Sequence, residues 1–278
     1  MLNLKKELEA YLKHLQEEEK SKNTIEKYER DIRKFLTFAE ASGKLDKQTV
    51  IGYKESITAQ YAVASVNSML VAVNCFLKYA GKADCCVRLL KSQRQSCVSE
   101  ERQLTREEFH RLIKAAATRQ DQRIMLVMET ICATGIRVSE LQFITAEAVK
   151  AGVAQVAMKG KCRSVFLPGR LRQKLKEYIR KKRISSGAVF CTAGGRPLNR
   201  SNIWAQMKKL CRAAGVAATK VFPHNLRHLF ARTFYQAERD IVALADILGH
   251  SSVETTRIYT KITAGEQARK IEQLRLIT

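Results

Sequence analysis

The chain has 278 residues, of which 45% are hydrophobic and 28% charged, a composition ordinary for one large or two modest globular domains. No apolar run approaches the roughly 20 residues of a membrane-spanning helix, and the N-terminal residues MLNLKK turn polar too early for a secretory signal, so we expect a cytoplasmic protein without a membrane partner. The formal net charge of +23 predicts a polyanionic partner.

The basic residues are concentrated in the second part of the chain. Residues 1–82 contain 14 Lys and Arg against 11 Asp and Glu, whereas residues 83–278 contain 36 against 16. Residues 150–232 contain 20 basic side chains and a single acidic one, Glu177. A membrane-binding protein would gather such charges on one amphipathic helix, but here they run across several predicted elements. The distribution therefore favours nucleic acid over a membrane surface.

The eight cysteines do not have the spacing of a metal site or of a disulfide framework. No two of them are separated by two residues, and Cys85 and Cys86 are adjacent. We therefore expect reduced thiols, no metal ion and no cofactor.

The first 82 residues are predicted to form a small four-helix domain. Apolar residues recur every three or four positions from Leu4 to Leu15, and Asn23-Thr24 is predicted to cap a second helix that Ser42-Gly43 closes. Shorter helical patterns follow at 46–57 and 63–80, without a proline. Helix is therefore expected throughout this segment.

Residues 83–103 lose the helical periodicity and are predicted to be a linker, in which residues 87–90 fit a short helical turn. Regular structure returns at Thr105, a predicted N-cap with Glu108 three residues later. Residues 104–278 are therefore predicted to form the second domain.

This second domain is predicted to be mainly helical with a small antiparallel sheet. Helical patterns at 105–118 and 120–134 precede a hairpin formed by residues 153–158 and 164–167. A third short strand is predicted at 188–191, and helix dominates from residue 200 onward.

Three of the five histidines lie between residues 224 and 250, close to Arg227. His224 and His228 could ligate a metal from one helix face, but a zincin-like motif would place glutamate where Asn225 stands. Cutting a phosphodiester without a metal requires a nucleophile, cations around the non-bridging oxygens and an acid for the leaving oxygen. Arginine suits the cationic role, and histidine or lysine can move the protons. The window therefore favours phosphate chemistry.

Five motifs of the chain resemble those of the tyrosine recombinases, the phage integrase and Xer family. In chain order they are residues 133–141 (ATGIRVSEL), 158–168 (MKGKCRSVFLP), 223–228 (PHNLRH), 248–250 (LGH) and 255–259 (TTRIY). Each motif alone is weak, since Gly135 could simply end a helix and Tyr259 could be one more half-buried aromatic residue. Their joint order and spacing are specific, and the resemblance covers nearly the whole chain.

The resemblance implies a catalytic role for each matched residue, and these residues are Arg137, Lys159, His224, Arg227, His250 and Tyr259. The two arginines would hold the scissile phosphate, and Tyr259 would be the nucleophile. His224 would act as base or proton relay for the tyrosine, and His250 would donate a hydrogen bond to a phosphate oxygen.

The resemblance leaves the catalytic lysine open. Lys159 would be the acid for the leaving 5′-hydroxyl, and Lys161 is the alternative, because the family usually has glycine where Met158 stands. Glu140 would hold Arg137 in place, and His228 would be a mainly structural neighbour.

The resemblance also implies the architecture and the reaction. An N-terminal SAM-like core-binding domain and a catalytic domain would form a two-domain clamp around a double-stranded DNA recombination site. Tyr259 would form a 3′-phosphotyrosine, and strand exchange would pass through a Holliday junction within a tetramer. The tail, residues 264–277, has apolar residues at helical spacing and would dock on a neighbouring subunit.

Two other classes of function share part of this pattern. A type IB topoisomerase would use a similar site without strand exchange, and a non-catalytic DNA-binding protein would explain the charge alone. The sequence also leaves the target site and the biological role open, among integration, excision, inversion and chromosome-dimer resolution.

Overall fold

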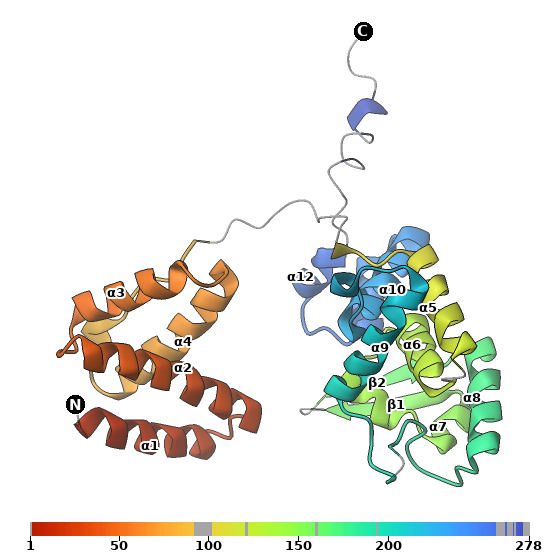
Figure 1. Cartoon of the computed structure of the whole chain (residues 1–278), viewed down its shortest axis with the longest axis horizontal. Coiled ribbons are helices and arrows are strands. Elements are labelled where there is room, and N and C mark those ends of the chain that lie inside the picture. The colour runs from red at the N-terminus through yellow and green to blue at the C-terminus, as the bar shows by residue number, and fades with distance from the viewer. Residues whose placement is uncertain are drawn as a thin grey trace. The chain divides into compact units, whose positions relative to one another are not determined.

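The computed structural model describes residues 2–91, 102–119, 122–158, 161–192 and 194–259, together with residues 265, 269 and 271–274. It divides into two compact units, Met1–Arg94 and Gln95–Thr278, which are described separately (Figure 1). Most of the described residues are helical, and none of the described helices is long and apolar enough to cross a membrane.

Helices packed around one apolar core form the N-terminal unit. They are α1 (Leu2–Glu17), α2 (Lys22–Ala41), α3 (Lys47–Thr58) and α4 (Val63–Tyr79). The buried positions of α2, among them Ile32, Phe35 and Ala39, follow the three-to-four-residue spacing of an amphipathic helix. The cap predicted at Asn23-Thr24 is wrong, because Ser21 caps α2 and its hydroxyl accepts the Thr24 N–H at 3.3 Å.

After a 3₁₀ turn, η1 (Ala83–Cys85), an extended segment lies along α4. We call residues 86–91 the strap. The Asn74 side chain accepts the Val87 N–H at 3.0 Å and donates to the Val87 carbonyl at 2.8 Å. Asn67 binds the N–H and carbonyl of Leu90 in the same way, at 2.8 and 2.9 Å. The helical turn predicted at 87–90 is therefore wrong: two asparagine amides hold this segment extended.

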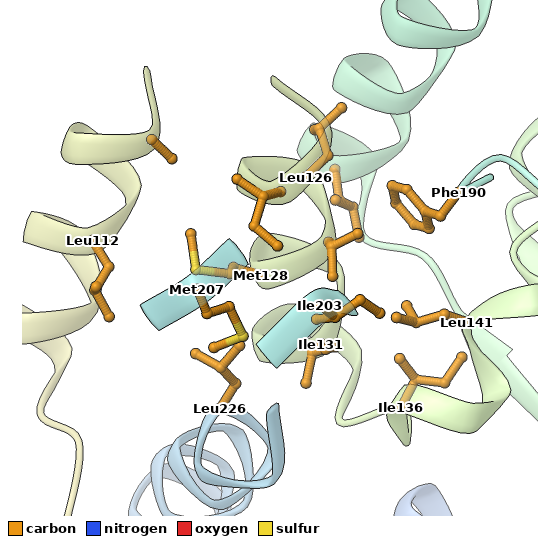
Figure 2. Packing of buried hydrophobic residues seen from close by; sticks show 14 of the residues in the cluster. Leu112, Leu126, Met128, Ile131, Ile136, Leu141, Phe190, Ile203, Met207 and Leu226 are labelled. Carbon is orange, nitrogen blue, oxygen red and sulfur yellow. The ribbon is translucent and has the colours of Figure 1, made fainter. Parts of the chain in front are cut away.

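The larger C-terminal unit is built around α6 (Gln122–Thr134), which packs against α5 (Arg106–Thr118), α8 (Gly169–Lys182), α9 (Arg200–Ala214) and α10 (Pro223–Glu238). Figure 2 shows side chains of α5, α6, α9 and α10 meeting in a common core. The remaining elements are η3 (Val138–Phe143), α7 (Ala146–Ala151), β1 (Val153–Met158), β2 (Lys161–Phe166), η4 (Ala218–Lys220), α11 (Ile241–Leu248), α12 (Val253–Thr256) and η5 (Arg257–Tyr259).

The start of α5 confirms the predicted capping box. Thr105 accepts the Glu108 N–H at 3.1 Å, and the Glu108 carboxylate accepts the Thr105 N–H at 2.9 Å.

The sheet in the described residues has two antiparallel strands, β1 and β2, with Val153 opposite Phe166 and Met158 opposite Lys161. The predicted mainly helical fold with a small antiparallel sheet is confirmed. The third strand predicted at 188–191 is wrong, because this segment forms only isolated bridges, from Ala188 to Thr145 and from Cys191 to Pro197. Its apolar residues Val189 and Phe190 are buried in the core, so their hydrophobicity reflects burial and not strand pairing.

The predicted helical tail, residues 264–277, lies largely outside the described residues. Of those that are described, Ile271 and Leu274 are each 60% exposed.

Candidate active site

The site begins where α6 ends. Gly135 closes this helix with a φ of +64°, and a Cβ there would lie 2.5 Å from the Phe230 ring and 2.9 Å from Leu248. Only glycine fits both the backbone angle and the space. The chain turns here into η3, which brings Arg137 beside the ends of α10 and α11.

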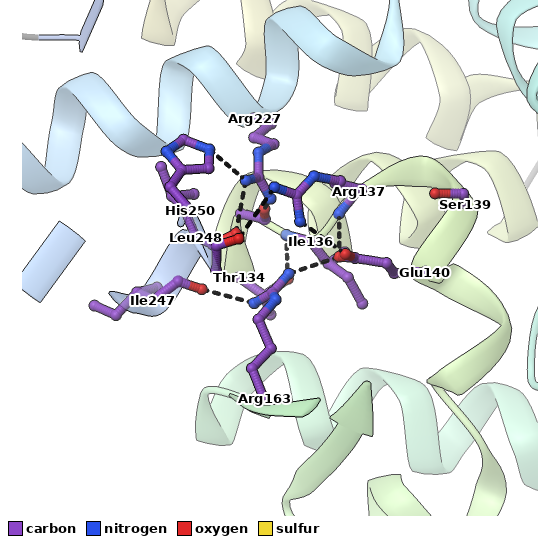
Figure 3. A network of polar contacts seen from close by, with 12 residues as sticks. Thr134, Ile136, Arg137, Ser139, Glu140, Arg163, Arg227, Ile247, Leu248 and His250 are labelled. Carbon is purple, nitrogen blue, oxygen red and sulfur yellow. Dashed lines mark hydrogen bonds and ion pairs between the residues drawn. The ribbon is translucent and has the colours of Figure 1, made fainter. Parts of the chain in front are cut away.

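Glu140 is the centre of a polar network (Figure 3). It accepts the Arg137 backbone N–H and the Arg137 Nη1–H, both at 2.9 Å, and Arg163 Nη2–H at 2.6 Å. The Glu140 side chain is only 4% exposed. Burial alone would raise the pKa of this carboxyl, but the hydrogen bonds from Arg137 and the charge of Arg163 hold it below its usual range. The predicted contact between Glu140 and Arg137 is present.

Arg227 lies on α10 and is 1% exposed. It donates through Nη1 to the Gly135 carbonyl and through Nη2 to the Leu248 carbonyl, at 2.8 Å for the latter. Burial, followed by the nearby charge of Arg137, lowers the pKa of Arg227 to about 10. Among the residues that the structure describes, its partners are carbonyls, a histidine and the Tyr259 side chain, not a carboxylate. A buried guanidinium held in this way is suited to an anionic ligand.

His250 follows Gly249, which ends α11 with a φ of +64°. Its Nε2 lies 3.0 Å from Arg227 Nη2, and its Nδ1 lies 2.8 Å from the Thr256 hydroxyl oxygen. A guanidinium can only donate, so Nε2 accepts this bond and Nδ1 carries the proton in the neutral ring. Burial and then the charge of Arg227 lower the pKa of His250 to about 4.

Three aromatic rings lie in sequence beside this network. The His224 and His228 centroids are 4.5 Å apart, and the His228 centroid is 4.9 Å from that of Tyr259, both edge to face. His250 also stacks on the tyrosine, with ring centroids 6.0 Å apart. Burial lowers the pKa of His228 to about 4 and also lowers that of His224. Tyr259 itself is 3% exposed and packs on Ala231, Leu244 and Leu248.

The structure thus brings together all the predicted site residues that it describes. Arg137, Glu140, Arg227 and His250 share the polar network, and His224, His228 and Tyr259 form the adjoining row of rings. Lys159 lies outside the described residues, and for Lys161 only the backbone, at the start of β2, is described. The ring in direct contact with Tyr259 on the α10 side is His228, not the predicted base His224.

A pocket of about 740 Å³ opens beside the network. Its lining includes Arg137 and His250 and, from the hairpin, Met158 and Cys162. Within the described part of the chain, no three His, Cys, Asp or Glu side chains gather as metal ligands.

Arg163 is the member of the network that the sequence interpretation missed. It is directly opposite Val156, which is 3% exposed, and two residues before the buried Val165 on the same face of β2. Strand alternation therefore points this arginine inward, where its guanidinium needs hydrogen-bond partners from the protein. The sequence interpretation did not use this alternation, because it predicted that the strand begins only at residue 164 and so left Arg163 outside it.

Comparison with protein families identifies the chain. The profile described as "Phage integrase family" matches residues 102–266, and that described as "Phage integrase, N-terminal SAM-like domain" matches residues 8–83. The chain belongs to the phage integrase family. Among the family's curated members, tyrosine recombinase XerA of Pyrococcus furiosus is 29% identical over 97% of this chain and 94% of its own length. Tyrosine recombinase XerD of Staphylococcus saprophyticus is 32% identical over 95% of this chain and 96% of its own length.

Solved structures of the family share the fold. The crystal structure of XerA recombinase is 26% identical and covers 99% of both chains with a TM-score of 0.54. XerH recombinase bound to its difH substrate before cleavage matches with 22% identity and a TM-score of 0.71, covering 91% of this chain and 79% of its own. A lambda integrase tetramer bound to a Holliday junction matches with 17% identity and a TM-score of 0.73, covering 92% and 76%.

Proposed function

We propose that this chain is a tyrosine site-specific recombinase that cuts and rejoins double-stranded DNA through a covalent phosphotyrosine. The observation that carries the proposal is the buried Arg227, which lies within hydrogen-bonding distance of His250 and is paired with carbonyls instead of a carboxylate. The relatives named XerA and XerD are tyrosine recombinases, and they match nearly the whole chain.

The scissile phosphate would bind against Arg137 and Arg227. The Arg137 side chain is 39% exposed and lines the pocket, and its Nη2 makes only a long contact, 3.4 Å, with the Gly249 carbonyl. It therefore has donors left for a phosphate oxygen. Arg227 would supply a second charge from a dry environment, where electrostatic stabilisation of the crowded transition state is strong.

Tyr259 would attack the phosphorus and form a 3′-phosphotyrosine, and the freed 5′-hydroxyl would leave. The row of rings supports a path for the phenolic proton through His228 towards His224, because both rings are neutral at pH 7 and neutral imidazole can accept a proton. His250 could donate to a phosphate oxygen in its other tautomer, with the proton on Nε2, once Arg227 turns to the phosphate and the Thr256 hydroxyl donates to Nδ1.

The leaving 5′-oxygen requires an acid. Lys159 remains our assignment, with Lys161 as the alternative, since both stand at the connection between β1 and β2, whose Met158 lines the pocket. The phosphodiester energy would be kept in the protein–DNA bond, so rejoining by another 5′-hydroxyl would need no external energy source.

Strand exchange would take place in a tetramer assembled on the recombination site in the cytoplasm. The lambda integrase tetramer on a Holliday junction shares the fold, which supports such an assembly. The apolar residues of the tail are suited to a contact with a neighbouring subunit, and Ile271 and Leu274 are exposed within this chain.

The decisive experiment uses nicked suicide duplexes tiled across the DNA that flanks the coding region. We expect a covalent adduct that is lost in Tyr259→Phe and kept in Tyr235→Phe, a control tyrosine that packs against the same small cluster. If wild type forms no covalent adduct with any duplex, the recombinase proposal is refuted and a non-catalytic DNA-binding protein is favoured. Adduct formation with supercoil relaxation, but without resolution of a synthetic Holliday junction, would point to a topoisomerase.

A further inference from the structure

We propose that Arg163 is a positioning residue that fixes the Arg137 guanidinium and the loop of His250 relative to each other; this inference rests on the proposed function. The motif that contains Arg163 was noted for its lysines, and the proposed reaction gives this arginine no role.

Arg163 connects three separate parts of the site. From β2 its Nη2 donates to Glu140 Oε2 at 2.6 Å, and its Nη1 donates to the Ile247 carbonyl near the end of α11 at 2.6 Å (Figure 3). Glu140 in turn holds the side chain and the backbone of Arg137. A single side chain thus connects the β1–β2 hairpin, the turn that carries Arg137 and Glu140, and the helix that precedes His250.

The loop before His250 also packs directly on the Arg163 stem. A Cβ on Gly249 would lie 2.4 Å from Arg163 Cδ and 2.8 Å from its Nε, so the backbone can approach only because residue 249 is glycine. The Gly249 carbonyl accepts Arg137 Nη2–H at 3.4 Å. The position of the loop is therefore set by Arg163 on one side and by Arg137 on the other.

Arg163 is placed to position other protein groups, whereas Arg137 is placed to bind the phosphate. The Arg163 side chain is 13% exposed, against 39% for Arg137, and both terminal nitrogens of Arg163 already bind protein groups. The planar fork of arginine is what lets one side chain bind a carboxylate and a carbonyl at once, and lysine cannot reproduce it. Small displacements of groups around a transition state can lower a rate about 100-fold.

The test compares Arg163→Met and Arg163→Lys with a matched control, Arg172→Met. Arg172 also donates to two backbone carbonyls, those of Val149 and Lys150, and also packs beside a positive-φ glycine, Gly152. Among the described residues, its contacts are with Val149, Lys150 and Gly152, none of them in the site. Arg172→Met therefore measures the stability lost when such an arginine is removed away from the site.

The quantities to be measured for each variant are the single-turnover cleavage rate of the nicked duplex, the affinity for DNA and the thermal midpoint. Both Arg163 variants should cleave about 100-fold more slowly than wild type at saturating enzyme, with DNA affinity within a few fold of wild type. Arg172→Met should cleave at close to the wild-type rate. Full activity of Arg163→Lys would overturn the proposal, because charge alone would then suffice.

A second substrate separates positioning from general destabilisation. A methylphosphonate at the scissile position removes the negative charge that Arg137 is held to stabilise. The defect of Arg163→Met should therefore shrink at least several-fold on this substrate, whereas an equal defect on both substrates would overturn the proposal. If the wild-type protein cleaves neither duplex, the proposed recombinase function itself is refuted. If wild type and Arg163→Met cleave equally fast, only this inference is refuted.

Discussion

Replacing Glu140 with glutamine should damage both the stability of the C-terminal unit and the site. The buried carboxylate balances two guanidinium groups and accepts a backbone N–H, at distances from 2.6 to 2.9 Å. Glutamine is nearly isosteric but neutral, so both arginines would lose their counter-charge. Removing one partner of a buried ion pair costs about 3–5 kcal/mol, and glutamine should fall near the lower value because its oxygen still accepts a hydrogen bond.

A loss of about 3 kcal/mol corresponds to a fall in thermal midpoint of roughly 6–12 °C for a unit of this size. The matched control is Glu177→Gln, which removes an exposed ion pair with Lys181 and should leave the midpoint almost unchanged. Circular dichroism melting at pH 7 measures both. Equal midpoints for Glu140→Gln and wild type would refute the argument that this carboxylate stabilises the network.

The same substitution has a predicted pH dependence. Burial raises the pKa of Glu140 in the folded state, but the hydrogen bonds from Arg137 and the charges of Arg163 and Arg137 together lower it below its usual value. The ionised carboxylate therefore stabilises the fold fully above its unfolded pKa of about 4.3, and this contribution is lost as the pH falls through the lowered value. The difference in midpoint between wild type and Glu140→Gln should be complete at pH 7 and should shrink below about pH 4.

The other predictions concern the loop, the histidines and the tail. Gly249→Ala should lower the melting midpoint and slow cleavage, because the new Cβ would clash with Arg163. The control is Gly215→Ala, which has a similar φ of +60° and open space around it, so its fall in midpoint measures only the strain of a positive φ. Burial lowers the pKa of His228 and His250 to about 4, so protonation favours unfolding and wild type should lose stability as the pH falls from about 6.5 to 4. His228→Asn should reduce that acid-dependent loss in melting experiments, and an unchanged pH profile would contradict the assignment. Deleting residues 264–278 should abolish cooperative assembly on DNA in band-shift experiments, and normal tetramers would rule out the docking role of the tail.

Much of this structure follows from local signals in the sequence. The capping box at Thr105 predicts the start of α5. The family resemblance predicts the contact of Glu140 with Arg137, three residues before it in the chain. The family motifs bring Arg227, His250 and Tyr259 to one place. These inferences succeed because each rests on short-range geometry or on a fixed order of motifs.

The rest depends on contacts between distant segments. No local rule indicates that Asn74 will hold the Val87 backbone, or that Phe190 is buried without belonging to a strand. The contact of His228 with Tyr259 depends on how α10 packs against η5. Arg163 is an intermediate case, since strand alternation indicates its direction but not its partners.

The strap has a consequence for how the sequence of this segment can change. Asn67 and Asn74 bind only the peptide groups of Leu90 and Val87, much as a neighbouring strand would, and Lys54 likewise binds the carbonyl of Arg88. Apart from the buried Val87 and the partly buried Cys86 and Leu90, which pack on the core, the path of the chain is therefore set by its backbone and by the side chains of α3 and α4. Exposed positions such as Leu89 can accept almost any residue, whereas proline at 87 or 90 would remove a required N–H. The exposed residues of the strap can therefore vary in sequence, while hydrogen bonds from α3 and α4 keep its backbone in the same position.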